Sequence, residues 1–271
     1  MTTALWTGLV ASALYLMAFL LAVRQLRSDQ PPQRLGFLGL GTLALLFHAC
    51  ALWHLVVQPG GVRLGLFPMA SLVGITGVAT VILSSLYRRL EWVSLMVFPY
   101  NMLALPLALF IDTGYQPHTL NHGLGAHVML AIIAFAVLAI ATSHGILVLL
   151  QHVQLKHGHI RGMMRAFPPI QVMETMLFEL VWVGVILLLL AIGTGFLFVE
   201  DLFAQDIAHK TILTLVSAAL FISLLAGRHV LGWRGVTAVR LTVIAFIVLM
   251  LGFFGSQLVL EVILQRHGMP H

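Results

Sequence analysis

The sequence predicts an all-α membrane protein, a polytopic transmembrane helical bundle of eight spans with both termini outside the cytoplasm. Three observations carry this prediction: an apolar composition, apolar runs of about 20 residues that recur along the chain, and basic residues that collect in alternate connections. Of the 271 residues, 60% are hydrophobic and 8% are charged, and the mean hydropathy is +1.03. A soluble protein of this length needs far more charge to cover its surface.

Each apolar run is long enough to cross a hydrocarbon core of about 30 Å as a helix. The predicted spans are 4–23, 35–57, 64–87, 92–111, 125–153, 178–199, 209–227 and 239–264. No connection between them is long enough to hold a soluble domain. Residues 1–271 are therefore predicted to form a single integral membrane domain.

Local signals justify these elements in order. The run 4–23 has no basic region before it and no small-residue cleavage site after it, so we expect a retained helix rather than a signal peptide. Pro59-Gly60-Gly61 marks the turn after the second span. The fourth span contains Pro99 and Pro106, which remove backbone donors and are expected to kink it. The acidic connection 200–208 separates the sixth span from the seventh on the outer side.

The basic residues predict the orientation. The first, third, fifth and seventh connections hold eleven of the fourteen Lys and Arg residues: Arg24, Arg27, Arg34, Arg88, Arg89, Lys156, Arg161, Arg165, Arg228, Arg234 and Arg240. The other side holds only Arg63, Lys210 and Arg266. Because the side richer in Lys and Arg faces the cytoplasm, both termini are predicted to lie outside it. The alternation holds only for an even number of spans, which supports the count of eight.

Several function classes find no support. The basic residues lie at helix ends, where they orient the chain, so nucleic acid is not an expected partner. The single cysteine, Cys50, can form no internal disulfide and is expected to be a small buried residue. The sequence contains no CxxC, CxxCH, P-loop or HExxH pattern.

The thirteen histidines carry most of the functional signal. His48 lies about nine residues inside the second span, roughly 13 Å below the outer surface. His127 and His209 begin the fifth and seventh spans at that same surface. Neutral imidazole is a good axial ligand for haem iron, and the three rings are placed to converge on one cavity in the outer half.

Both haem-iron ligands expected first, His127 and His48, have an ordinary alternative, a hydrogen bond to a neighbouring helix. For His144, inside the fifth span, that structural role is the expected one. Lys210 and Arg63, at the outer face, are candidates to pair with haem propionates. Two functions without haem also stay open. One is a membrane accessory protein that regulates a transporter or an enzyme, and the other is a small-molecule or ion transporter that uses the kinked fourth span.

Three stretches resemble a known family. They are Phe47-His48-Ala49 in the second span, Ala126-His127-Val128-Met129-Leu130 at the start of the fifth, and Gly232-Trp233-Arg234-Gly235 after the seventh, with Gly252-Phe253-Phe254-Gly255 following in the last span. In their order and spacing they resemble the CcsA/CcmC-type cytochrome c assembly membrane protein family, and within it the branch called YpjD or HemX-like. The eight-span layout with both termini outside also fits that family.

The resemblance implies a haem-binding or haem-handling protein of the bacterial inner (cytoplasmic) membrane that acts in cytochrome c biogenesis or haem supply. His127 matches the family's first outer haem ligand, and His48 matches a histidine that recurs in the second span. The implied cofactor or cargo is haem b, and the implied partners are haem, the lipid bilayer and other cytochrome c biogenesis proteins. The segment before the seventh span lacks the family's tryptophans, and Ala226 stands where the family has a histidine. We therefore expect no independent catalytic activity, such as haem attachment, from this chain alone.

Overall fold

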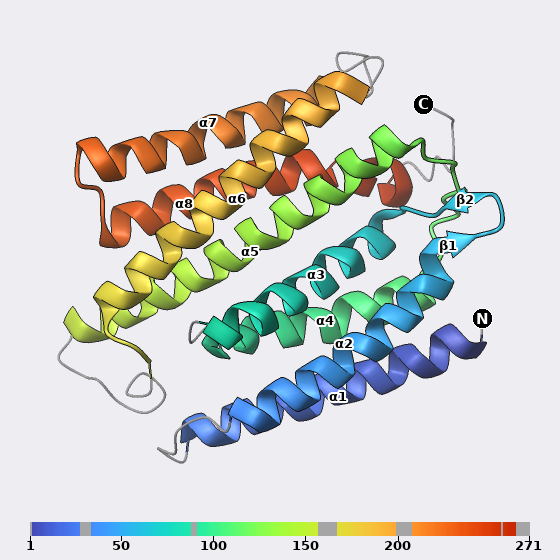
Figure 1. The fold of residues 1–271 in the computed structure, drawn as a ribbon, viewed down its shortest axis with the longest axis horizontal. Coiled ribbons are helices and arrows are strands. Elements are labelled where there is room, and N and C mark those ends of the chain that lie inside the picture. Colours follow the sequence, from blue (N-terminus) through green and yellow to red (C-terminus); the bar gives the residue numbers. More distant parts are fainter. Residues whose placement is uncertain are drawn as a thin grey trace. The chain divides into compact units, whose positions relative to one another are not determined.

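The structure, a computed structural model, describes residues 2–27, 34–87, 91–156, 167–198, 208–255 and 257–263. These residues form helices joined by short connections and one small hairpin (Figure 1). The elements are α1 (Thr2–Arg27), α2 (Arg34–Val56), β1 (Val57–Gln58), β2 (Gly61–Val62), α3 (Leu66–Tyr87), η1 (Glu91–Val93), α4 (Ser94–Phe110), α5 (His122–Lys156), α6 (Ile170–Phe198), α7 (Ala208–Val230) and α8 (Gly235–Met250), followed by π-helical segments Leu251–Gly255 and Leu258–Ile263. The predicted all-α polytopic bundle is confirmed, and α1 to α8 correspond one to one to the predicted spans.

Membrane-spanning length separates α4 from the other helices. Within the described ranges, seven helices are long and apolar enough to cross a membrane, counting α8 with its first π-helical turn as Gly235–Gly255. α4 has 17 residues, which gives about 26 Å at 1.5 Å per residue and falls short of the hydrocarbon core. The 3-10 turn η1 leads directly into α4. The exact count of eight spans and the location of the termini stay predictions.

α6 begins earlier than the apolar pattern indicates. The predicted span starts at 178, whereas the helix starts at Ile170, directly after Pro168-Pro169. The carbonyl of Pro169 accepts the amides of Val172 and Met173 at 2.9 and 3.2 Å, which closes the first turn. Proline is well tolerated at a helix start, where its missing N–H costs no hydrogen bond. With 29 residues, α6 is about 43 Å long and exceeds the thickness of the apolar core.

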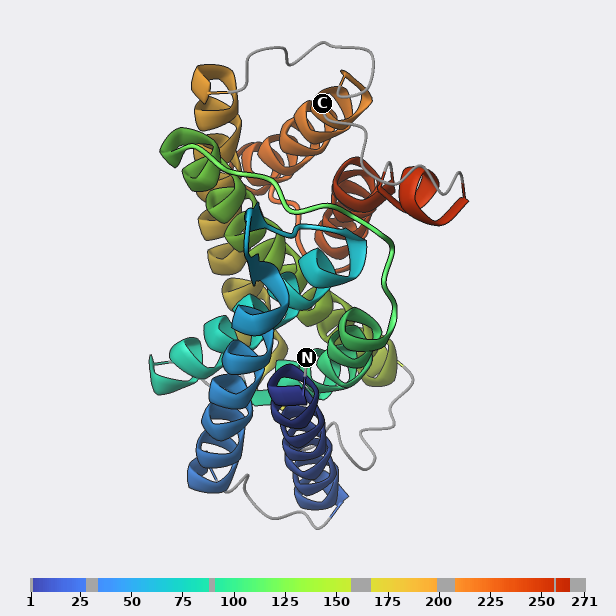
Figure 2. The ribbon, with the colours of Figure 1, turned by 90° about the vertical axis from the view of Figure 1, so that its right-hand side faces the viewer.

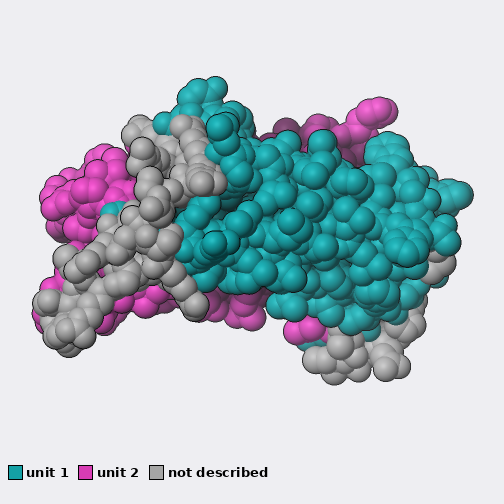
Figure 3. Space-filling view, turned by 90° about the horizontal axis from the view of Figure 1, so that it is seen from below, with its two compact units in different colours: residues 1–119, 161–167, 259–271 teal, residues 120–160, 168–258 magenta. Residues whose placement is uncertain are grey.

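The chain divides into two compact units, coloured separately in Figure 3. Unit 1 comprises residues 1–119, 161–167 and 259–271, and unit 2 comprises residues 120–160 and 168–258. The prediction of one integral membrane domain is not tested by this division.

Unit 1 is built from α1 to α4. Figures 1 and 2 both show α1 lying beside α2, and α1 also packs on α4. Three rings from three helices form its centre. Phe98 of α4 lies with its ring centroid 5.6 Å from Tyr15 of α1 and 5.6 Å from Phe37 of α2. Tyr15 and Phe98 are completely buried, so this cluster holds the three helices together.

Cys50 is exposed, and the prediction of a buried cysteine is wrong. The reason lies in the helical period. His48, two residues earlier on α2, points into unit 1 and is fully buried. At 100° per residue, position 50 lies on nearly the opposite side of the same helix.

A small hairpin closes unit 1 on the side predicted to be the outer one. Val57 pairs with Val62 across β1 and β2, and Val62 forms a further bridge with His118 through amide bonds of 2.9 and 3.1 Å. Gly61 has φ +137°, and a Cβ there would overlap the backbone of His118. The close approach of the 111–121 connection to the hairpin therefore requires glycine at this position.

Unit 2 is built from α5 to α8. α5 packs along α6 and also contacts α8, which in turn packs against α7. Phe135 of α5 is the centre of an aromatic cluster on the α8 side, with ring centroids 5.0 Å from Phe246, 4.8 Å from Phe253 and 5.3 Å from Phe254. The Gly-Phe-Phe-Gly stretch of the last helix thus contributes to the core of this unit.

The turn between α7 and α8 has a defined geometry. The carbonyl of Gly227 accepts the amides of Leu231 and Trp233 at 2.9 and 3.1 Å, and Gly232 has φ +66°. This is the pattern of a helix that ends at a left-handed glycine. The indole of Trp233 folds back onto Gly227, where a Cβ would overlap its ring.

Candidate functional site

His127 makes the hydrogen bond to a neighbouring helix that was its ordinary alternative role, and its role as a haem ligand stays a prediction. It lies in the second turn of α5, half-buried against α6. Its Nδ1 is 2.9 Å from the carbonyl oxygen of Ala191 and 3.4 Å from the Thr194 hydroxyl. A carbonyl oxygen only accepts, so Nδ1 carries the proton and donates it. The neutral ring therefore keeps its lone pair on Nε2, the arrangement that a backbone carbonyl imposes on ligating histidines.

The surface of α6 next to this ring is made of small residues. A Cβ at Gly195 would lie 3.1 Å from Cε1 and 3.3 Å from Nδ1 of His127. A Cβ at Gly193 would meet nothing within 4 Å. Only a glycine at 195 allows the ring to lie this close to the α6 backbone without a shift. The donor chemistry at His127 fits an axial haem ligand, because Nδ1 is anchored and no residue that the structure describes bonds to Nε2.

His48 has a different environment in unit 1. The ring is completely buried, and both of its nitrogens have partners. Nδ1 is 3.1 Å from the Tyr15 hydroxyl, and Nε2 is 2.8 Å from the Ser71 hydroxyl. The three side chains join α1, α2 and α3. His48 therefore offers no free lone pair in this arrangement, and a ligand role, which stays a prediction, requires that one of these bonds opens.

His209 and Lys210 lie in the first turn of α7 in unit 2, and the side chain of His209 is exposed. Among the described residues, no hydrogen bond or ring contact joins His209 to His127. His48 and Arg63 belong to unit 1, whereas His127, His209 and Lys210 belong to unit 2. The predicted convergence of the three histidines on one cavity therefore stays a prediction.

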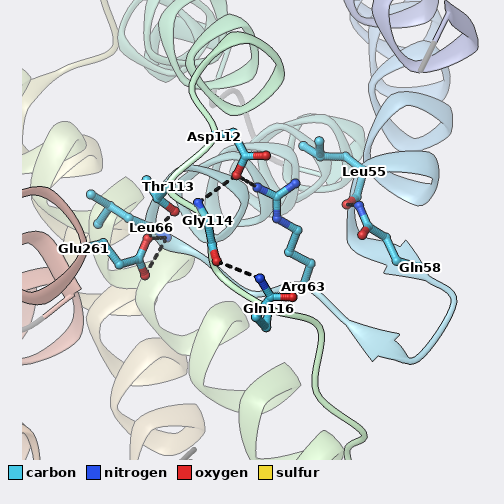
Figure 4. A network of polar contacts seen from close by, with 9 residues as sticks. All are labelled: Leu55, Gln58, Arg63, Leu66, Asp112, Thr113, Gly114, Gln116 and Glu261. Atoms are coloured by element: carbon cyan, nitrogen blue, oxygen red, sulfur yellow. Dashed lines mark hydrogen bonds and ion pairs between the residues drawn. The ribbon is translucent and has the colours of Figure 1, made fainter. Parts of the chain in front are cut away.

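Arg63 has a carboxylate partner. Its guanidinium forms an ion pair with Asp112, and the same carboxylate accepts the Gly114 amide at 2.8 Å (Figure 4). The backbone amide of Arg63 donates to the carbonyl of Val56 at 2.8 Å. Arg63 thus ties the hairpin to the end of α4. A contact with a haem propionate, the role predicted for it, would involve a side chain that already neutralises Asp112.

Glu261 is the buried charge that the sequence analysis missed. Its carboxylate accepts the Thr113 hydroxyl at 2.7 Å and the Leu66 amide at 3.0 and 3.2 Å, all within unit 1 (Figure 4). Leu66 is the first residue of α3, so the carboxylate caps this helix and is favoured by its dipole. Burial and the Glu261 charge raise the pKa of Tyr115. One sequence signal could have indicated such a partner. No Ser, Thr, Asp or Asn stands at 62–65, so no local side chain of these types caps the start of α3.

His144 and Asn101 are two polar side chains inside helices that form hydrogen bonds between helices. Nε2 of His144 donates to the carbonyl of Met173 at 2.9 Å, which confirms the expected structural hydrogen bond. Two residues after Pro99 in α4, the Asn101 amide donates to the carbonyls of Gly74 and Val97 at 3.2 and 2.8 Å. Asn101 thus bonds α4 to α3 within unit 1, and the kink predicted at the prolines stays a prediction.

Comparison with known proteins agrees with this layout. The profile of the cytochrome C assembly protein family matches residues 39–264. The chain is 30% identical over 225 residues to the inner membrane protein YpjD of Escherichia coli strain K12, covering 82% of this chain and 85% of that protein. It is 27% identical over 234 residues to an uncharacterized 28.8 kDa protein in the nifR3-like 5' region of Azospirillum brasilense, covering 83% and 85%. No solved structure matches the chain. The match from the second span to the last helix, together with the all-α bundle, shows that this chain belongs to the cytochrome c assembly protein family.

Proposed function

We propose that this chain binds or passes a b-type haem in the outer half of the membrane, with His127 as an axial ligand to the iron. Its role is in cytochrome c biogenesis or in haem supply to that process. The chain is a multi-pass protein of the bacterial inner membrane, as its apolar helices and the name of its relative YpjD indicate. The family match supports the haem-related process.

One observation carries the proposal, the hydrogen bond from Nδ1 of His127 to the carbonyl of Ala191 at 2.9 Å. This bond has two effects. It selects the tautomer with the lone pair on Nε2, and it fixes the direction of the ring. When bound, haem supplies an iron centre that accepts this lone pair and two propionates that need cationic or polar partners.

The remaining candidates have secondary roles in this proposal. Lys210 supplies a cation on unit 2, the unit of His127, and is assigned to a propionate. His209, the exposed residue before Lys210, is assigned as a second donor to the haem iron, whether the haem is a bound cofactor or a cargo. His48 has both nitrogens bonded, to Tyr15 and Ser71. We assign it a role as a buried polar group of unit 1 and not as an iron ligand.

The test is His127→Ala in the purified full chain, with haemin titrated while the Soret absorbance is recorded. We expect the wild type to gain a Soret band and the variant to lose it or to show it shifted and weakened. The matched control is His122→Ala, because His122 is the exposed first residue of the same helix. The control is expected to titrate like the wild type.

If both variants lose the Soret band to the same extent, haemin binds nonspecifically to imidazoles at the membrane surface. That result would contradict the proposal. A wild type that shows no Soret band, even after haemin is added, would favour an accessory protein without haem. Substrate flux in proteoliposomes that His127→Ala leaves intact would instead favour a transporter.

A further inference from the structure

Arg228 is a charged side chain that the haem proposal does not use. It lies in the last turn of α7, in unit 2, and is half-buried. Its guanidinium carbon lies 4.5 Å above the centre of the Phe178 ring of α6. Among the described residues it makes one hydrogen bond, a long one of 3.5 Å from Nη1 to the carbonyl of Trp233. In the part of the chain that the structure describes, no carboxylate forms an ion pair with it.

This geometry leaves most of the donors of Arg228 available. A guanidinium has five N–H groups in a planar fork, which matches the oxygens of a phosphate. The Phe178 ring holds the guanidinium over its face through a cation–π contact. An arginine held over an aromatic ring, partly withdrawn from water and without an anionic partner among the described residues, is well suited to bind an anion from outside the protein.

The surroundings of Arg228 have the character of a membrane interface. The ring of the next residue, His229, lies 6.3 Å from the indole of Trp182 on α6. Trp182 is 45% exposed, and tryptophan is enriched at the level of lipid headgroups. Further along the same helix, Val183 and Ile186 are 50% and 52% exposed. A polar anchor is thus followed by an open apolar helix face of the kind that an acyl chain covers.

The charge at this end of unit 2 is positive. Arg234 and Arg240, at the start of α8, are both exposed, and so is Lys156 at the end of α5. α6 carries two acidic side chains, so the balance at this end stays positive: Glu174 is turned toward α8, with Oε1 3.5 Å from the Cβ position of Gly235, and Glu179, next to Phe178, is exposed. The distribution of Lys and Arg predicts that this end faces the cytoplasm, where the leaflet carries anionic lipids.

We propose that Arg228, Phe178, Trp182 and His229 form a binding site for the headgroup of an anionic phospholipid in the cytoplasmic leaflet. Arg228 donates to the phosphodiester oxygens, Trp182 lies beside the glycerol region, and one acyl chain follows Val183 and Ile186. A zwitterionic lipid carries the same phosphate. Its ammonium group, however, would be repelled by the neighbouring arginines, so the site distinguishes lipids by net charge.

The test uses the purified full chain in detergent and native mass spectrometry with phosphatidylglycerol and phosphatidylcholine of identical acyl chains. The wild type is expected to prefer phosphatidylglycerol by about fivefold to tenfold, the range for one charge-assisted contact near a surface. Arg228→Gln is expected to abolish most of this preference. Arg240→Gln removes the same charge from an exposed position at the same end of unit 2. This variant is expected to keep the preference for phosphatidylglycerol within about twofold of the wild type.

Three outcomes would overturn the proposal. The first is a wild type that binds both lipids equally well, a result that needs no variant. The second is an equal loss of preference in Arg228→Gln and Arg240→Gln, which would show attraction to the whole basic surface. The third is displacement of the lipid by millimolar inorganic phosphate regardless of acyl chain, which would assign the site to free phosphate. Trp182→Leu gives an independent check, since it keeps every charge but should still weaken retention of phosphatidylglycerol.

Discussion

At the scale of single residues, His127 and His48 differ in whether a ring nitrogen is available to bind a ligand. His127 gives one nitrogen to a main-chain carbonyl and keeps the other, whereas His48 uses both nitrogens on the hydroxyls of Tyr15 and Ser71. The difference follows from the partner. A carbonyl can only accept, but a hydroxyl donates or accepts and so can satisfy either nitrogen of the imidazole.

Gly195 provides a prediction at this scale. Gly195→Ala places a Cβ 3.1 Å from Cε1 of His127, so the ring must shift and the bond to Ala191 must lengthen. We expect haemin affinity to fall by roughly threefold to tenfold, the equivalent of about 1 kcal/mol. Haemin titration of the purified protein measures this change.

The control for this prediction is Gly193→Ala, two residues away on the same helix, where a Cβ meets nothing within 4 Å. Both substitutions gain the same helix propensity, up to about 1 kcal/mol. If Gly193→Ala weakens haemin binding as much as Gly195→Ala does, the effect arises from α6 in general and not from contact with the imidazole.

At the scale of elements, helix ends explain more than helix interiors. The apolar pattern predicted where helices cross the membrane, but it could not show how α3 begins or how α7 ends. α3 begins on a carboxylate 195 positions away in the sequence, and α7 ends at the Gly232 turn with Trp233 folded back onto Gly227.

Glu261→Gln tests the cap of α3. The amide keeps the shape of the carboxylate, but it has one accepting oxygen instead of two and no charge, so the stability of the fold should fall by about 1–2 kcal/mol. The pKa of Tyr115 should fall as well, because an anionic neighbour disfavours the phenolate. Burial persists, so the pKa should remain above that of a free tyrosine.

The measurement is a phenolate absorbance titration, with Tyr115→Phe subtracted to isolate this group among the four tyrosines. The sign is specific. A Tyr115 pKa that rises or stays constant in Glu261→Gln would show that the carboxylate carries no charge beside the phenol in the folded protein.

Gly227→Ala tests the turn between α7 and α8. The added Cβ overlaps the six-membered ring of Trp233, so the indole must leave its position, and we expect a loss of about 2 kcal/mol or more in stability. Thermal unfolding in detergent measures it. Gly36→Ala, on α2 with nothing within 4 Å, should be neutral or stabilising, and Trp233→Leu should make Gly227→Ala far less harmful.

At the scale of the whole molecule, the sequence predicted the class of protein, the number of main helices and the family, because hydropathy and short motifs are local properties. It did not predict long-range pairs. The Tyr15–His48–Ser71 cluster depends on which faces of three helices meet, and hydropathy does not encode this when α2 is apolar on all sides. Cys50 was wrongly expected to be buried for the same reason.

Topology is the prediction that belongs to this scale. In a Cys50→Ser background, Gln116→Cys and Arg234→Cys each place one thiol at an exposed position. Because basic connections stay in the cytoplasm, a membrane-impermeant maleimide should label residue 116 in cells whose outer membrane is permeabilised and whose inner membrane is intact. Residue 234 should react only after the inner membrane is lysed. The reverse pattern would invert the orientation, and labelling of both positions from one side would disprove the eight-span count.

The anchor of His127 is a main-chain oxygen, and every amino acid at position 191 provides one. No point substitution can delete this acceptor. The buried methyl of Ala191 can therefore be exchanged for another small group while the imidazole keeps its proton on the same atom, provided that the packing of α5 and α6 tolerates the added volume. Drift at this position would leave the ligand intact, so a search for relatives of the site should weigh the glycine at 195 and the ring at 127, and should disregard the identity of residue 191.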